Sequence, residues 1–512
     1  MGISNLCRIL CIWALMNSCL LPLSTSGFVR ISLKRVHQTT LHNAIRSAKK
    51  LGIHEADFKG LFARAAEKHT ENIYLKNYMN TQFVGEIGIG TPAQKFSVIF
   101  DTAITYVWIP SSKCNSSVCK ACEFHSKYNS SNSSTYTKIG TPHEIIYGTE
   151  AKISGILSQD YVQVGGLHVK DQLLFEAIVE ESQTLILAKF DGVVGLAYPD
   201  KSNGLAPLIW NTMAEQGLLR KNMFSIWFNP NPEAEIGGEI VFGGVDPNHF
   251  KGEHTYVPVT PNQNGIWQIE IGEFFIGEHS SGYCQEGCAA VLDSGSPLLS
   301  GPTAIVIEIN HAIGGKRVKS MECKEVVFQY GEAIHALLAS GINPDKICSK
   351  LSLCSINKAQ YMRNDLNTVQ KTENRKELAS VADEQLCNVC KITVIWIQNQ
   401  MKQEKSVNEI LDYISKLCYN FPAPEGNIVV PCDHLSHMPN LTLTIGNRPF
   451  TFTPKQYIHR SEEHDKMVCR SQFYAVDLQN PPGSWIFGNT FMGVFHSVFD
   501  FGKQRVGFAD GA

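Results

Sequence analysis

Ser97-Val98-Ile99-Phe100-Asp101-Thr102-Ala103 and Ala289-Ala290-Val291-Leu292-Asp293-Ser294-Gly295 are two segments with one pattern: an apolar run, an acid, a hydroxyl residue and a small residue. Each apolar run is typical of a buried strand. A carboxylate at the end of such a strand loses hydration, which raises its pKa and costs free energy unless partners compensate it. We therefore expect Asp101 and Asp293 to meet in space. The copies differ at their last residue, since Ala103 stands where the second copy has Gly295.

The composition of the chain is that of a globular protein. Of its 512 residues, 43% are hydrophobic and 10% are aromatic, which is enough for sizeable cores and for more than one domain. The formal net charge is −3, and no long run of like charge is present. Because proteins that bind nucleic acid usually carry a basic surface, nucleic acid is not an expected partner.

The N-terminal residues predict secretion. Residues 1–26 have the regions of a signal peptide, with Arg8 ahead of an apolar run over 9–16 and small residues over 24–27. The run is too short for a membrane span, and the alternative is a buried N-terminal helix. No later stretch reaches about 18 apolar residues, so we expect a soluble mature protein. Residues 27–70 are rich in basic residues and predict either a pro-segment that neutralises an acidic cleft or a plain solvated helix.

The cysteines predict disulfides of an oxidising compartment. Three of the 16 lie in the signal peptide. Local spacing favours the pairs Cys114–Cys119, Cys284–Cys288 and Cys432–Cys469. Six more between residues 323 and 418 form a framework whose connectivity the spacing leaves open, and Cys122 has no partner. The glycosylation sequons, which fit secretion, are at Asn115, Asn129, Asn132 and Asn440.

The remaining chain is predicted to be mainly β. From Lys76 onward, short apolar runs are punctuated by glycine and proline, as in residues 85–92. The repeat continues beyond the two acids, because residues 190–196 and 485–489 are apolar runs broken by glycine, which permits close backbone approach. Two similar halves that each supply one acid place a functional site at their interface.

Residues 321–424 interrupt the second half and differ in character. Apolar residues recur at helical spacing over 326–338, 387–401 and 410–418, so this insert is predicted to be helical and cross-linked by its cysteines. Within it, residues 355–384 are polar and charged, which predicts an exposed, protease-accessible loop.

An ordered set of motifs resembles the pepsin-like aspartic proteases, in particular the plant vacuolar type of phytepsin and the cardosins. The motifs are KNYMN (76–80), FDT (100–102), WIP (108–110), YGT (147–149), FDG (190–192), DSG (293–295), GPT (301–303) and FDFG (499–502). The resemblance implies a mainly β, bilobal fold with an inserted saposin-like helical domain. Its expected parts are an N-terminal β lobe over 71–250, a C-terminal β lobe over 251–320 and 425–512, and the insert over 321–424.

In this family one catalytic aspartate lies at the floor of each half, and Asp101 and Asp293 match these positions. Two carboxyl groups held close together cannot both ionise easily, so they share a proton. The ionised member takes a proton from a bound water, and the protonated member donates to the scissile carbonyl oxygen. No metal, cofactor or covalent intermediate is required. The pair titrates as a unit, so the sequence leaves open which aspartate carries the proton.

The resemblance also assigns supporting roles. Thr102 and Ser294 match hydroxyls that tie the two strand ends together, although such hydroxyls also occur in ordinary turns. Tyr147 matches the tyrosine of the flap that closes over substrate, and Trp108 matches the aromatic residue that supports it; both residue types also pack in cores. The residues predicted to block the pair in the inactive precursor, until acid weakens the contact, are Lys34, Lys76 and Tyr78.

For the insert, the resemblance to saposins implies the disulfides Cys323–Cys418, Cys348–Cys390 and Cys354–Cys387. It also implies contact with a lipid bilayer or a vacuolar sorting role; the alternative is a structural module that is cut out during maturation. The expected partners are polypeptide substrates and a lipid bilayer. The expected protein is a monomer or a two-chain form in the secretory pathway, either vacuolar or extracellular. A zinc site of Cys432, His434 and His437 is not expected, because Cys432 matches a disulfide cysteine.

Four features near the pair depart from the family pattern. Ala103 replaces a glycine, and Ile104 replaces a serine whose hydroxyl donates to the first aspartate, a loss that should raise the pKa of Asp101. Pro297 replaces a serine and removes a backbone donor. The flap is one residue longer than usual, with Glu150 in place of glycine, and a slipped hairpin would reverse which side chains face the cleft.

Three functions are compatible with these residues. The intact acid–base groups favour an acid endopeptidase with reduced or narrowed activity. The second function is peptide binding without catalysis, which Ala103, Ile104 and the longer flap would explain. The third places the main role in the insert, as a lipid-interacting or sorting module. Cleavage of an unfolded protein at acidic pH would separate the first two.

Overall fold

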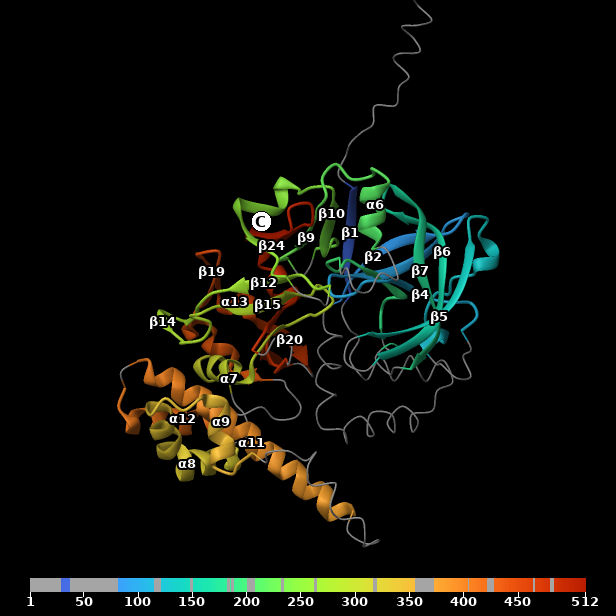
Figure 1. The fold of residues 1–512 in the computed structure, drawn as a ribbon. Helices are drawn as coiled ribbons and strands as arrows, with labels where there is room; N and C mark the ends of the chain where they lie inside the picture. Colours follow the sequence, from blue (N-terminus) through green and yellow to red (C-terminus); the bar gives the residue numbers. More distant parts are fainter. Residues whose placement is uncertain are drawn as a thin grey trace, which may run out of the picture.

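The computed structural model is mainly β, with a group of helices at one end (Figure 1). It describes residues 29–36, 82–114, 121–147, 151–181, 185, 188–199, 208–231, 234–261, 265–315, 320–354, 373–403, 405–420, 428–463, 466–478 and 483–512. The predicted signal peptide, most of the predicted pro-segment, Lys76, Tyr78, Asn115 and Cys119 lie outside these residues.

The largest sheet has 13 strands in the order β11-β25-β24-β9-β10-β1-β2-β3-β8-β4-β7-β6-β5. One end of this sheet consists of strands from the first half of the chain: β2 (Gln82–Ile89), β3 (Gln94–Asp101), β4 (Val107–Pro110), β5 (Thr137–Tyr147), β6 (Ala151–Val164), β7 (Leu167–Glu181) and β8 (Gly192–Gly195). The strands at the other end are β9 (Phe224–Phe228), β10 (Gly238–Phe242), β11 (Phe250–Pro258), β24 (Phe495–Asp500) and β25 (Arg505–Gly511).

β1 (Val29–Val36) joins these two groups, because it pairs with β10 on one side and with β2 on the other. It lies within the residues predicted as a pro-segment. Ile31 and Leu33 are buried while Arg30 and Lys34 are exposed, and this alternation is that of a strand with one face on a core. The predicted lobe boundary at residue 250 falls within this sheet, since β9 and β24 are paired.

The second half of the chain repeats the core of the first. β3 pairs in parallel with β8, β8 pairs antiparallel with β4, and β4 pairs in parallel with β7. β15 (Cys288–Leu292), β23 (Trp485–Phe487), β16 (Leu299–Gly301) and β22 (Phe473–Ala475) repeat this order and these directions. A Cβ atom would lie 2.4 Å from the Ile104 carbonyl oxygen at Gly195 and 2.3 Å from the Leu298 carbonyl oxygen at Gly488, so matching positions in both halves require glycine.

Smaller elements complete the β assembly. The remaining strands are β12 (Gln268–Ile271), β13 (Phe274–Ile276), β14 (His279–Ser280), β17 (Val429–Val430), β18 (Leu441–Ile445), β19 (Arg448–Phe452), β20 (Ile458–Glu463) and β21 (Lys466–Ser471). The helices outside the insert are α6 (Ile209–Glu215), α7 (Thr303–Ala312), α13 (Pro454–Tyr457) and α14 (Asn489–Met492). Short 3₁₀ helices are η1 (Ala121–Glu123), η2 (Ser130–Asn132), η3 (Pro247–His249), η4 (Cys418–Asn420) and η5 (Cys432–His437).

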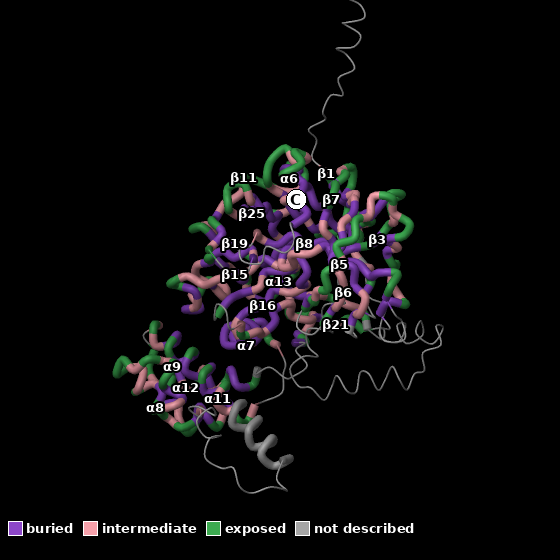
Figure 2. The backbone as a smooth tube through the Cα atoms, turned by 45° about the vertical axis from the view of Figure 1, so that its right-hand side comes forward, coloured by how far each residue is buried: buried purple, intermediate pink, exposed green. Residues whose placement is uncertain are grey.

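The described helices of the insert are α8 (Met321–Ala339), α9 (Pro344–Lys350), α11 (Glu373–Met401) and α12 (Val407–Leu417). Their buried side chains form a cluster of their own, which also includes Ala304 and Ile307 of α7. Trp396 of α11 is fully buried, and its indole N–H donates to the Ala304 carbonyl at 3.0 Å. Figure 2 shows buried segments inside both the β assembly and the helix group. Among the described residues, no helix is both long and apolar enough to cross a membrane.

Six disulfides connect described cysteines. They are Cys114–Cys122, Cys284–Cys288, Cys323–Cys418, Cys348–Cys390, Cys354–Cys387 and Cys432–Cys469. The predicted pair Cys114–Cys119 was wrong, because Cys114 is bonded to Cys122. Both partners belong to a buried cluster of the first half, and local spacing could not distinguish two nearby cysteines.

Candidate active site

The two sequence motifs are tied together by four buried hydrogen bonds in a two-fold pattern. The Thr102 hydroxyl donates to the Leu292 carbonyl at 2.8 Å and accepts from the Ser294 N–H at 2.9 Å. The Ser294 hydroxyl donates to the Phe100 carbonyl at 2.7 Å and accepts from the Thr102 N–H at 3.0 Å. Because each side chain binds the backbone of the opposite half, the ends of the two strands are fixed side by side.

This joint brings the two aspartates together. Asp101 is the last residue of β3, and Asp293 directly follows β15. A Cβ atom at Gly295 would lie 2.2 Å from Oδ2 of Asp101. The backbone of the second motif therefore lies directly against the carboxyl group of the first, as the pairing of the two acids predicts.

The two carboxyl groups differ in their hydrogen bonds. Oδ1 of Asp293 accepts from the N–H groups of the second and third residues after it, at 2.9 Å and 3.1 Å. Oδ1 of Asp101 accepts from the Ala103 N–H at 2.8 Å, but the next N–H, of Ile104, is bonded to the Asp101 backbone carbonyl at 3.4 Å. A donor stabilises the charged form of a carboxyl group, so Asp293 is the better holder of the negative charge.

Burial raises the pKa of both aspartates. Asp101 is 2% exposed, and loss of hydration is the largest cause that raises its pKa well above the usual value; the charge of Asp293 raises it further, and the Ala103 N–H lowers it. Burial raises the pKa of Asp293 to about 6, against the lowering effect of the Gly295 and Ser296 N–H groups. Burial therefore raises the pKa of both carboxyl groups, and the additional N–H donor on Asp293 favours the shared proton on Asp101.

The replacements near the pair have different structural effects. Ala103 is not among the residues with positive φ, so its methyl group needs no left-handed backbone. Ile104 has no hydroxyl to donate, and its side chain packs against the buried cluster of the first half. Pro297 still contributes a backbone acceptor, because its carbonyl accepts from the N–H and the hydroxyl of Thr490 at 3.1 Å and 2.9 Å.

The predicted flap is the hairpin of β5 and β6. Its register runs without a shift from Pro142 to Tyr147, which lies opposite Ala151. Ile145 and Ile153 pair directly and are both buried, whereas Ile146 is exposed. The described part of the hairpin therefore alternates regularly in its faces up to Ile146, and the slipped hairpin stays a prediction. Its tip, residues 148–150 with Glu150, lies outside the described residues.

Trp108 lies in β4, in register with Phe175 of β7 and Val193 of β8. It is 1% exposed and belongs to the same buried cluster as Ile145 and Ile153 of the hairpin. The position of Trp108 beside the hairpin fits the predicted supporting role.

Lys34, the described member of the predicted precursor lock, lies in β1 opposite Val84 and is exposed. No lysine is among the groups that shift the pKa of Asp101 or Asp293 within the described chain. A role for Lys34 in blocking the pair therefore stays a prediction.

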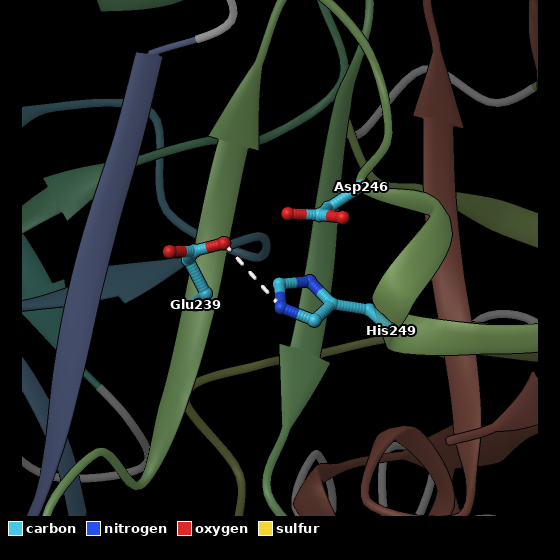
Figure 3. A group of neighbouring side chains, drawn as sticks. All are labelled: Glu239, Asp246 and His249. Atoms are coloured by element: carbon cyan, nitrogen blue, oxygen red, sulfur yellow. Dashed lines mark ion pairs between the residues drawn. The ribbon is translucent and has the colours of Figure 1, made fainter.

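β1 is anchored by Arg30, which pairs with Asp246 at 2.7 Å and with Glu239 at 3.6 Å. Glu239, Asp246 and His249 lie together (Figure 3), and they are the one group of three possible metal ligands among the described residues. The Arg30 guanidinium contacts both carboxylates, so the three acidic and basic side chains form an ion-pair cluster with His249 beside it. Cys432, considered from the sequence as a zinc ligand, is bonded to Cys469, so it has no thiolate available to a metal.

The described glycosylation sequons differ in accessibility. Asn132 and Asn440 are exposed. The side-chain oxygen of Asn129 accepts from the Ser131 N–H at 3.1 Å and caps η2. Asn132 and Asn440 are therefore the more accessible of the three.

Similarity to known proteins covers almost the whole chain. The model of the eukaryotic aspartyl protease family matches residues 82–511. The chain belongs to this family. It is 45% identical over 505 residues to an aspartic proteinase of Oryza sativa subsp. japonica, with 98% of each chain covered. It is 43% identical over 515 residues to phytepsin of Hordeum vulgare, with 100% of each covered, and 42% identical over 493 residues to procardosin-B of Cynara cardunculus, with 95% of each covered.

Two polar groups of this aspartyl protease were not predicted from its sequence. Glu308 of α7 is buried and accepts from the Tyr283 hydroxyl at 3.1 Å and the Tyr413 hydroxyl at 3.5 Å, and burial raises its pKa to about 8. The sequence feature that could have indicated this buried acid is its position as a single acidic residue inside an apolar helical run. The second is the pair of Tyr106 and His143, in which the phenol oxygen and Nε2 are hydrogen-bonded at 3.0 Å. The sequence has no signal for this pair.

Proposed function

We propose that this aspartyl protease hydrolyses peptide bonds of polypeptide substrates with Asp101 and Asp293 as the catalytic pair. The supporting observation is the reciprocal bonding of Thr102 and Ser294, which fixes the two acids at the junction of the repeated halves. Membership of the family supports an acid endopeptidase. The nucleophile is a water molecule bound between the carboxyl groups.

The reaction begins with Asp101 protonated and Asp293 ionised. Asp293 takes a proton from the water as its oxygen attacks the peptide carbonyl carbon, and Asp101 gives its proton to the carbonyl oxygen. The product of this step is a neutral tetrahedral diol. In the second step the C–N bond breaks, Asp293 returns its proton to the leaving nitrogen, and Asp101 regains a proton from one diol hydroxyl. One water is consumed, and both aspartates regain their starting states.

The surroundings of Asp101 determine the pH range of activity. The Asp101 carboxylate accepts one backbone N–H where the Asp293 carboxylate accepts two, and Ile104 supplies no hydroxyl that could add a donor to Asp101. The singly protonated pair therefore persists to higher pH than it would with a serine at position 104. The proposed activity therefore extends to higher pH, and its acid–base groups stay intact.

Cleavage of an unfolded protein between pH 3 and pH 7 tests this function. The processed chain should release peptides, and Asp101→Asn and Asp293→Asn should each lose about 1,000-fold or more of the rate, since either change removes one member of the acid–base pair. Matching thermal midpoints would show that the variants are folded. Absence of cleavage by the unchanged chain, or undiminished cleavage by either variant, would overturn the proposal.

The insert is proposed to be a docked module of a protein of the secretory pathway. Its buried cluster includes Ala304 and Ile307 of α7, which supports a structural role in the intact chain. Six disulfides support passage through an oxidising compartment, vacuolar or extracellular. Lipid contact remains a prediction, and leakage of anionic vesicles at acidic pH by the intact chain tests it.

A further inference from the structure

The loop between β3 and β4 has a rigid backbone at Tyr106. The Tyr106 carbonyl accepts from the Gly195 N–H at 2.9 Å. A Cβ atom on Gly195 would lie 2.7 Å from the Tyr106 nitrogen, so the loop packs directly against β8. Because β8 pairs with β3 up to Asp101, the position of Tyr106 is fixed relative to the catalytic aspartate.

His143 lies at the base of the flap, four residues before Tyr147 in β5. It shares a strand face with the buried residue Ile145, because side chains of a strand alternate. Its ring lies edge-on to the buried ring of Phe175, with centroids 6.2 Å apart. Among the described strands, β5 is the last of its sheet and pairs with β6.

A β-bulge lies opposite His143. His143 pairs with Gly155 of β6, and the register between β6 and β7 shifts between Ser154 and Gly155. A Cβ atom at Gly155 would lie 2.0 Å from the Glu176 carbonyl oxygen, so only glycine fits this bulge. Bulges bend a strand and increase its local twist. The bulge therefore sets the angle at which the hairpin leaves the sheet, and His143 is directly opposite it.

We infer that Tyr106 and His143 form a strap that holds the flap in position over the catalytic pair. The Tyr106 hydroxyl and His143 Nε2 are 3.0 Å apart, and the two ring centroids are 5.4 Å apart. The strap joins the loop after Asp101 to the base of the flap. The inference rests on the proposed function, because it makes both residues positioning residues for peptide hydrolysis.

The strap operates in both charge states of the imidazole. A neutral ring accepts the phenol proton at Nε2, and a protonated ring donates to the phenol oxygen. The flap contacts substrate before and during the reaction, so its position affects ground-state and transition-state binding alike. Loss of the strap should therefore raise KM with little change in kcat.

Tyr106→Phe removes the hydroxyl and keeps the ring. Tyr136→Phe is the matched control, because the Tyr136 hydroxyl lies 3.4 Å from the Ser158 hydroxyl of β6 and so makes no link to the loop after Asp101. Amide hydrogen exchange over residues 143–147 should be about three- to tenfold faster in Tyr106→Phe, as expected for one lost hydrogen bond, and unchanged in the control. KM should rise by a similar factor of about three to ten in Tyr106→Phe alone.

Two further results complete the test. His143→Gln keeps a side-chain amide that can meet the phenol and should restore much of the exchange protection that His143→Ala loses. Exchange in Tyr106→Phe equal to that of the control would overturn the strap. Hydrogen exchange can be measured without catalysis, so it tests the strap independently of the proposed function. If the unchanged chain has no peptidase activity, the proposed function is refuted, and the exchange rates still show whether the strap is present.

Discussion

Gly295→Ala tests how closely the two halves of the active site approach each other. The new Cβ atom would lie 2.2 Å from Oδ2 and 2.6 Å from Cγ of Asp101, whereas ordinary contacts begin at 3.4 Å. One of the two motifs must therefore move by roughly 1 Å, and Asp101 is held by the Ala103 N–H and by burial. A misplacement of about 1 Å can reduce an enzymatic rate on the order of 100-fold.

The assay is kcat/KM for one peptide substrate, measured with the processed protein. Gly295→Ala should lose about 100-fold or more. Gly166→Ala is the matched control, because a Cβ atom there meets nothing within 4 Å, and its activity should be unchanged. Thermal unfolding separates local displacement from loss of the fold. A folded Gly295→Ala protein that keeps more than about a tenth of the activity would refute the close contact between the motifs.

Three other changes have expected outcomes. Ile104→Ser adds a donor beside Asp101 and stabilises its charged form, so the alkaline limb of the pH–rate profile should move down by about one pH unit; an unmoved limb would contradict the role given to Ile104. Thr102→Ala leaves a buried N–H and a buried carbonyl without their partner, so it should lower the free energy of unfolding, measured in urea, by about 2–4 kcal/mol. Thr102→Ser keeps the hydroxyl and should lose much less stability. Equal losses in the two variants would show that the hydroxyl does not matter. The pKa of Glu308 is raised from 4.5 to about 8, so its stabilising contribution is complete below its unfolded pKa and is lost as pH rises towards 8. Glu308→Gln mimics the neutral form, so it should be more stable than the unchanged protein by about 4 kcal/mol at pH 7.5 and equally stable at pH 4; one constant difference at both pH values would show that Glu308 does not titrate.

The catalytic pair and the repeat were accessible from sequence because they have local signals. A buried-strand pattern that ends in an acid is rare, and here it occurs twice with a hydroxyl next to it. The glycines of residues 190–196 and 485–489 indicated close backbone approach, and Gly195 and Gly488 do lie against the loops that follow the two acids. These features depend on a few neighbouring residues, so the order of the chain was enough to predict them.

Other features depend on contacts between distant residues. Cys119 and Cys122 both follow Cys114 closely in the sequence, and the structure bonds Cys114 to Cys122, which lies in a buried cluster with Ala121. The insert was predicted as a separate unit, but its buried cluster includes part of α7. The sequence of α7 shows that the helix is apolar, but it does not show which element packs against the helix. The strand at 29–36 was not predicted, because basic residues are also typical of a solvated segment, although the apolar residues of this strand alternate.

The most direct test of a working catalytic pair is the turnover number of the processed protein beside that of its Ala103→Gly variant, on one unfolded protein substrate at acidic pH. Ala103 needs no left-handed backbone, and its N–H reaches Oδ1 of Asp101 at 2.8 Å. We therefore expect the unchanged protein to turn over substrate within about threefold of the variant. Turnover that is absent from the unchanged protein and present only in Ala103→Gly would contradict a working pair and would indicate a peptide-binding protein without catalysis.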